Sequence, residues 1–148
     1  MISFLDTSAL IKLYVEEAGG DGVLQSIQRA DLLAVSELTL IETHSALARL
    51  EREHKISRSA CTALRRDVNA EFKAFYFQVR VSARLKQTAC RLLVNHALRA
   101  MDAMQFASAL IIKRNRRRRV VFASFDVKLN LAAMQAGMEI LQSPVPKK

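Results

Sequence analysis

Residues 2–8 read ISFLDTS, a short apolar run that ends at an acid and two hydroxyl side chains. The residues that follow, 9–14, place their apolar side chains at helical spacing. A strand followed at once by a helix, with an acid at the junction, is typical of a parallel α/β sheet, in which ligands bind beyond the carboxyl ends of the strands. Asp6 also has a plainer interpretation as a helix N-cap, a role that either of the next two residues could fill.

The alternation of strands and helices continues along the chain. Further short apolar or β-prone runs predict strands at residues 32–35, 75–81, 120–123 and 138–141. Helical patterns are found at residues 23–29, 36–54, 56–69, 83–95, 98–110 and 129–135. This order favours the α/β class.

Length and composition favour one domain. The chain has 148 residues, 51% of them hydrophobic, and no linker rich in proline or glycine divides it. We therefore expect a single domain over residues 1–142 and a short tail over 143–148, which contains both prolines. No apolar run approaches the roughly 18 residues that a membrane span needs, and the start of the chain lacks the basic segment of a signal peptide. The two cysteines have no metal-ligand spacing, so we expect free thiols and a cytoplasmic location.

The charge predicts a polyanionic partner. The formal net charge is +9 and the isoelectric point is near 10.2, which favours nucleic acid or an acidic protein as the partner. The densest cluster of positive charge consists of Arg114, Arg116, Arg117, Arg118 and Arg119, next to Lys113. Such a run could be a solvated loop, a contact with RNA phosphates or a patch for an acidic protein.

Two acids lie on apolar faces of predicted helices. Asp102 shares its side of the helix with Leu98 and Phe106, and Glu42 has Leu38 at i−4 and an alanine at i+4. A carboxylate among apolar neighbours is costly to desolvate unless a cation or strong donors meet it. For Glu42 an internal ion pair with Arg49, at i+7, is the structural alternative.

A fourth acid repeats the arrangement of Asp6. Asp126 also follows an apolar strand and precedes a helix, so an alternating chain can bring Asp6, Glu42, Asp102 and Asp126 to one end of a parallel sheet. Two carboxylates about 5 Å apart repel by roughly 3 kcal/mol at an effective dielectric constant near 20, so a cluster of four would recruit a divalent cation or raise its own pKa values. Oxygen ligands without histidine or cysteine suit Mg²⁺ or Mn²⁺, which polarise a phosphodiester and activate water.

Four sequence blocks resemble one known family. They are LDTSAL at residues 5–10; SELTLIE at 36–42, followed by Ala46 and Leu47; LRAMDA at 98–103, continuing to Ala107; and FASFD at 122–126, followed by Leu129, Ala132, Ala133 and Gly137. In this order and at this spacing they resemble the PIN-domain proteins of the VapC type, which are ribonuclease toxins of type II toxin–antitoxin systems. The resemblance covers nearly the full length of the chain.

The resemblance implies a three-layer α/β/α sandwich with a mainly parallel sheet of about five strands. It implies that Asp6, Glu42 and Asp102 bind the metal, with Asp126 as a fourth acid acting directly or through water. Ser8 and Ser124 would orient carboxylates or water. The family cuts RNA, usually structured RNA such as tRNA, with Mg²⁺ or Mn²⁺, and leaves a 3′-hydroxyl and a 5′-phosphate.

Family members usually form homodimers and are held inactive by a cognate VapB-like antitoxin. One position departs from many relatives, because Gln105 stands where they carry histidine, three residues after the third acid. The pattern does not make that position a metal ligand, so the chemistry should survive, while the contacts made there stay open.

Two other functions stay open from the sequence. The chain could be a non-catalytic RNA- or protein-binding module whose acids serve as caps and ion pairs. It could also be a PIN nuclease that acts without an antitoxin.

Overall fold

A computed structural model of the chain describes residues 1–115 and 118–141. Its five strands form one sheet in the order β3-β2-β1-β4-β5, and every neighbouring pair is parallel. The strands are β1 (Ile2–Leu5), β2 (Leu32–Ser36), β3 (Tyr76–Val79), β4 (Val120–Ala123) and β5 (Glu139–Ile140). The predicted α/β fold is confirmed, whereas the predicted tail at 143–148 lies outside the described residues.

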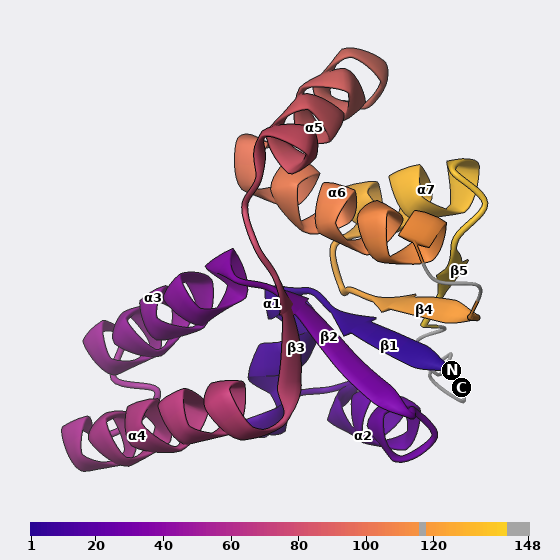
Figure 1. Cartoon of the computed structure of the whole chain (residues 1–148). Coiled ribbons are helices and arrows are strands. Elements are labelled where there is room, and N and C mark those ends of the chain that lie inside the picture. Colours follow the sequence, from indigo (N-terminus) through magenta and orange to yellow (C-terminus); the bar gives the residue numbers. More distant parts are fainter. Residues whose placement is uncertain (116–117, 142–148) are drawn as a thin grey trace, which may run out of the picture.

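Helices cover both faces of this sheet (Figure 1). The chain forms α1 (Thr7–Leu10), the 3₁₀ turn η1 (Ile11–Leu13), α2 (Gly20–Gln28), α3 (Leu38–Arg52), α4 (Arg58–Ala74), α5 (Ala83–Asn95), α6 (Ala100–Asn115) and α7 (Val127–Gln135). One hydrophobic core joins the sheet to α1–α4, and a second joins it to α5–α7. The molecule is therefore a three-layer α/β/α sandwich.

The strands are apolar because both of their faces are buried. In β1, Phe4 contributes to the core with α5–α7, and the next residue, Leu5, contributes to the core with α1–α4. Phe4 stacks on Phe122 of β4 with 5.8 Å between ring centroids, and Phe122 packs against Phe106 of α6 at 6.0 Å. This aromatic contact fixes α6 against the middle of the sheet.

The topology has a switch point between β1 and β4. From β1 the chain moves to β2 and β3 on one side, and then crosses back to β4 and β5 on the other. Connections that leave two adjacent strands in opposite directions open a crevice at their carboxyl ends, where α/β proteins bind ligands. Asp6 follows β1 and Asp126 follows β4 by three residues, so both acids lie at this crevice.

Several predicted boundaries were wrong. Helix α2 begins at Gly20 instead of residue 23, and α6 ends at Asn115 instead of residue 110. Helix α4 continues to Ala74 instead of ending near residue 69, and the N–H of Phe75 still donates to its last turn. The strand predicted at 75–81 is shorter because Val81 N donates to the Glu37 carboxylate at 2.6 Å, which turns the chain away from the sheet. Across residues 1–115 and 118–141, no helix is both long and apolar enough to cross a lipid bilayer.

Candidate functional site

Asp6 is buried at the carboxyl end of β1. It is 6% exposed, and its backbone N–H continues the sheet by donating to Ala123 O at 2.9 Å. Its Oδ2 atom accepts hydrogen bonds from Ser8 Oγ at 2.6 Å, Ser124 Oγ at 3.1 Å and Ser8 N at 3.3 Å. Asp6 is thus the N-cap of α1, and it also lies at the crevice at the carboxyl end of β1. The two roles that the sequence suggested for Asp6, helix capping and a place in the site, are therefore compatible.

Ser8 and Ser124 connect the first helix to the loop between β4 and α7. Their hydroxyl oxygens lie 3.3 Å apart. Ser8 Oγ accepts the N–H of Phe125 at 2.9 Å, and Ser124 Oγ accepts the N–H of Asp126 at 3.1 Å. Both serines therefore orient Asp6 and fix the loop that carries Asp126.

Glu42 points from α3 toward the same end of the sheet and is half-buried. Its Oε2 atom accepts hydrogen bonds from Thr7 Oγ1 at 2.9 Å and from the side-chain amide of Gln105. Among the described residues no ion pair joins Glu42 to Arg49, whose side chain is exposed. Neutral donors, not a cation, therefore hold this carboxylate.

Gln105 is a site residue whose role the sequence left open. It is 1% exposed, and its amide also exchanges hydrogen bonds with Thr39 Oγ1 at 2.9 and 3.2 Å and donates to Thr7 Oγ1 at 3.2 Å. The sequence signal for this role was its spacing. Gln105 is three residues after Asp102, so both side chains lie on the same side of α6. Its contacts within the protein show that it orients Glu42.

Asp102 and Asp126 complete the group of four acids. Asp102 lies in the first turn of α6 and is half-buried. Asp126 is the N-cap of α7, where its Oδ1 atom accepts the N–H of Leu129 at 2.8 Å. The structure therefore places one acid at the start of each of α1, α6 and α7 and one on α3.

The acids influence one another electrostatically. Burial raises the pKa of Asp6 above its ordinary value, although the serine hydrogen bonds oppose this effect. Burial also raises the pKa of Glu42, and the negative charges of Asp6 and Asp102 raise it further. The pKa of Asp102 is raised by burial first and by the charge of Asp126 second. A bound cation would relieve this desolvation and repulsion.

The donor chemistry fits Mg²⁺ or Mn²⁺. All four side chains offer carboxylate oxygens, the ligands that these hard cations prefer. Within residues 1–115 and 118–141, however, no three acidic, histidine or cysteine side chains lie close enough together to form a ligand set as placed. Mg²⁺ keeps several waters and is usually bound by only one or two carboxylates, so a partly water-filled coordination sphere suits this arrangement.

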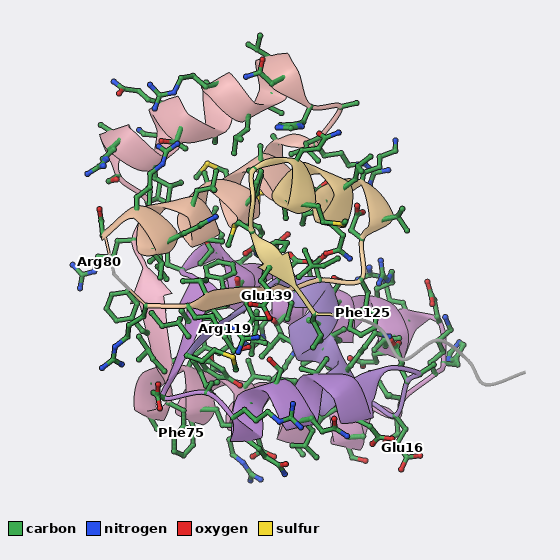
Figure 2. The ribbon with its side chains drawn as sticks, turned by 90° about the vertical axis from the view of Figure 1, so that its right-hand side faces the viewer. Glu16, Phe75, Arg80, Arg119, Phe125 and Glu139 are labelled. Carbon is green, nitrogen blue, oxygen red and sulfur yellow. The ribbon has the colours of Figure 1, made fainter. Side chains whose placement is uncertain are left out.

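The described residues of the arginine run, Arg114, Arg118 and Arg119, lie at the opposite end of the sheet from the acids. Arg114 lies in the last turn of α6, and Arg118 and Arg119 precede β4. Arg119 O accepts the N–H of Ile2, at the start of β1, at 2.8 Å. The Arg119 guanidinium pairs with Glu139 of β5 (Figure 2). The other members of the run, Arg116 and Arg117, lie outside the described residues. The described arginines of the run are therefore not brought together with the acids.

Comparisons with known proteins show the family of the chain. The family model described as PIN domain matches residues 3–133. Ribonuclease VapC45 of Mycobacterium tuberculosis (strain CDC 1551 / Oshkosh) is 31% identical over 137 residues, which are 93% of this chain and 92% of that protein.

Solved structures share the fold at lower sequence identity. The crystal structure of Mycobacterium tuberculosis VapC20, a sarcin–ricin loop cleaving toxin, covers 96% of this chain and 99% of its own, with a TM-score of 0.64 and 20% identity. A toxin–antitoxin complex from Klebsiella pneumoniae covers 85% of this chain and 88% of its own, with a TM-score of 0.61 and 15% identity. Since the family model and a relative at 31% identity each span most of its length, the chain belongs to the PIN domain family and is related to the VapC proteins.

Proposed function

We propose that the chain is a divalent-metal-dependent endoribonuclease toxin that hydrolyses RNA phosphodiester bonds. The observation that carries this proposal is the position of four acids at the carboxyl end of the sheet, around the switch point between β1 and β4. The relative named Ribonuclease VapC45 supports RNA as the substrate.

Three of the four acids share one role in this proposal. Asp6, Glu42 and Asp102 would hold Mg²⁺ or Mn²⁺, in part through bound water as their placement requires, and Asp126 would contribute directly or through a water molecule. When bound, such a metal polarises the phosphodiester and makes water a better nucleophile. The chain's own residues prepare the site, because the serines next to Asp6 and the amide next to Glu42 fix one oxygen of each carboxylate before any ligand arrives.

The proposal includes a protein partner. A cognate VapB-like antitoxin would hold the toxin inactive, which the toxin–antitoxin complex of similar fold supports. We further propose a homodimer that acts on structured cytoplasmic RNA such as tRNA. The free thiols of Cys61 and Cys90 suit such a reducing compartment.

The direct test is cleavage of total cellular RNA by purified wild type and by Asp102→Asn, each with Mg²⁺, with Mn²⁺ and with EDTA. We expect cleavage by wild type with either metal and no cleavage by the variant or in EDTA, because the variant lacks one of the proposed metal ligands. Fragments should carry 5′-phosphates.

The same experiment separates the alternatives. If wild type and variant bind RNA equally and neither cuts it, the chain is a binding module and its acids are structural. A further arm adds the protein encoded by the open reading frame next to that of this chain. If wild type cuts RNA and the added protein does not inhibit the cleavage, the chain is a PIN nuclease that acts without an antitoxin.

A further inference from the structure

One stretch of the chain, from the end of α4 to the start of α6, contains cations and no acids. Between Glu71 and Asp102 the sequence has six lysines and arginines and no aspartate or glutamate. They are Lys73, Arg80, Arg84, Lys86, Arg91 and Arg99. This fifth of the chain thus contributes six of the nine net positive charges. The six cations are not consecutive in the sequence, so they do not form a charge run.

The fold places both ends of the segment from Arg80 to Arg99 at the same end of the sheet as the acids. Strand β3 ends at Val79, whose carbonyl accepts the N–H of Glu37 at 3.0 Å, at the carboxyl end of the neighbouring β2. Arg80 follows at once, and α5 begins three residues later, next to α6 (Figure 1). At the other end of the segment, Arg99 directly precedes α6, and its carbonyl accepts the N–H of Ala103, the residue after Asp102, at 3.0 Å. This segment therefore begins and ends beside the candidate site.

These cations are available to a ligand. Arg80, Arg84, Lys86, Arg91 and Arg99 are exposed, and none of them takes part in an ion pair with another described residue. Figure 2 shows the Arg80 side chain extending away from the ribbon. Arg84 lies in the first turn of α5, where a positive charge opposes the helix dipole, so it does not serve the stability of that helix.

Helices α3 and α4, the other helical pair beside the site, have a different distribution of charges. These helices and the turn between them mix acids with their cations, and the structure pairs Lys55 with Glu53 in the turn and Arg66 with Asp67 in α4. Four carboxylates repel an incoming phosphodiester, so cations near them are needed to hold a nucleic acid at this end of the sheet. The stretch from Arg80 to Arg99 meets that need, whereas the described part of the arginine run lies at the far end.

We propose that Arg80, Arg84, Arg91 and Arg99 form a surface that binds the sugar–phosphate backbone of RNA and leads it to the acids; Arg84 and Arg91, seven residues apart, share one side of α5. This inference rests on the proposed function and assigns its substrate surface. RNA is favoured over an acidic protein because the surface begins and ends beside the acids at which a phosphodiester must lie for cleavage.

The test compares two matched pairs of arginines in an Asp102→Asn background with EDTA, so that RNA is bound and not cut. One variant is Arg84→Gln with Arg91→Gln, and the control is Arg114→Gln with Arg118→Gln at the far end of the sheet. Both remove two exposed arginines. Binding of fluorescently labelled bulk tRNA is measured by anisotropy over a range of salt concentrations.

We expect the α5 variant to bind tRNA on the order of tenfold more weakly at 0.1 M salt. The slope of log binding constant against log salt concentration should be smaller in magnitude by about 1.4–1.8, because two phosphate contacts are lost. The control should keep a slope close to that of the background protein. Equal slopes in the α5 variant and the background protein would overturn the inference, and so would a loss of slope in the control alone. Cleavage by the protein with its native Asp102 is measured separately, so a failure of the proposed function is distinguished from a failure of this surface.

Discussion

Glu42 owes its orientation to a buried amide. Gln105 and Thr7 donate to the same carboxylate oxygen, and Gln105 is almost fully buried. A neutral donor fixes a carboxylate without neutralising it, so the negative charge remains available to a metal.

This contact predicts the effect of Gln105→Leu. Leucine has a similar size and no donor, so the Glu42 carboxylate and the Thr39 hydroxyl lose partners. We expect roughly 10–100-fold weaker Mn²⁺ binding by calorimetry, as is typical for partners of metal ligands, and a free energy of unfolding lower by about 1–3 kcal/mol. Gln105→His, which keeps a ring N–H donor, should recover part of the Mn²⁺ affinity. Wild-type Mn²⁺ affinity in Gln105→Leu would show that the amide does not position Glu42 for a metal.

Asp102 predicts a pH effect on the metal-free protein. Because its folded pKa is raised above the ordinary value of 3.8, the folded state binds the proton more tightly than the unfolded state. Its charged form therefore destabilises the protein above the raised folded pKa, and this penalty disappears as pH falls to the ordinary value. In EDTA, Asp102→Asn should be more stable than wild type at pH 7, and the difference should shrink toward pH 4. Chemical denaturation at several pH values measures this difference, and a variant that is less stable at pH 7 would contradict it.

Among the elements, the β4–α7 loop depends on a contact with the start of α2. Phe125 lies between Ser124 and Asp126, and its ring packs against Gly19, with Lys12 Nζ 4.5 Å from the ring centroid. Gly19 has φ +94°, and a Cβ added there would lie within 2.7 Å of Phe125 Cζ. The loop that carries Asp126 therefore requires a glycine in a distant segment.

This packing predicts that Gly19→Ala disturbs the site. Backbone strain and the clash with Phe125 should together lower the free energy of unfolding by about 1–3 kcal/mol, and RNA cleavage should fall because the ring moves the loop between Ser124 and Asp126. Gly137→Ala is the matched control, since it has φ +68° with Lys113 Nζ as its nearest contact at 3.7 Å. It should lose stability and keep activity. If both variants cleave RNA equally well under conditions in which both are folded, the packing of Phe125 is not needed by the site.

The sequence predicted the central elements better than their ends. Strands β1 and β4 are buried on both faces, so their apolar runs are continuous and easily recognised. Strand β3 lies at the edge of the sheet, and its aromatic residues adjoin a helix that continues to Ala74. Its limits depend on the hydrogen bond from Val81 to Glu37, a contact between residues far apart in the sequence that periodicity does not show.

For the molecule as a whole, the site follows from the topology. The positions of Asp6 and Asp126 could be predicted because each follows a central strand, and parallel strands end at the same edge. The role of Gln105 could not be predicted, because it depends on how α3 and α6 approach each other. The location of the described arginines of the run could not be predicted either, because a run of charges does not indicate the end of the sheet at which it lies.

A whole-molecule prediction concerns metal and stability. A cation that binds only the folded chain stabilises it by about 2.7 kcal/mol at a concentration of 100 times its Kd. Mn²⁺ should therefore raise the midpoint of thermal unfolding of wild type and raise that of Asp102→Asn much less. Differential scanning calorimetry gives both values, and equal shifts would mean that Mn²⁺ binds elsewhere.

The most direct measurement is an anomalous difference map from a crystal of the chain soaked in Mn²⁺. We expect one strong peak among Asp6, Glu42, Asp102 and Asp126, with carboxylate and water oxygens around it, and loss of that peak in Asp102→Asn. If wild type has no peak at these acids under saturating Mn²⁺, the four carboxylates do not form a metal site and the proposal of a metal-dependent ribonuclease is contradicted.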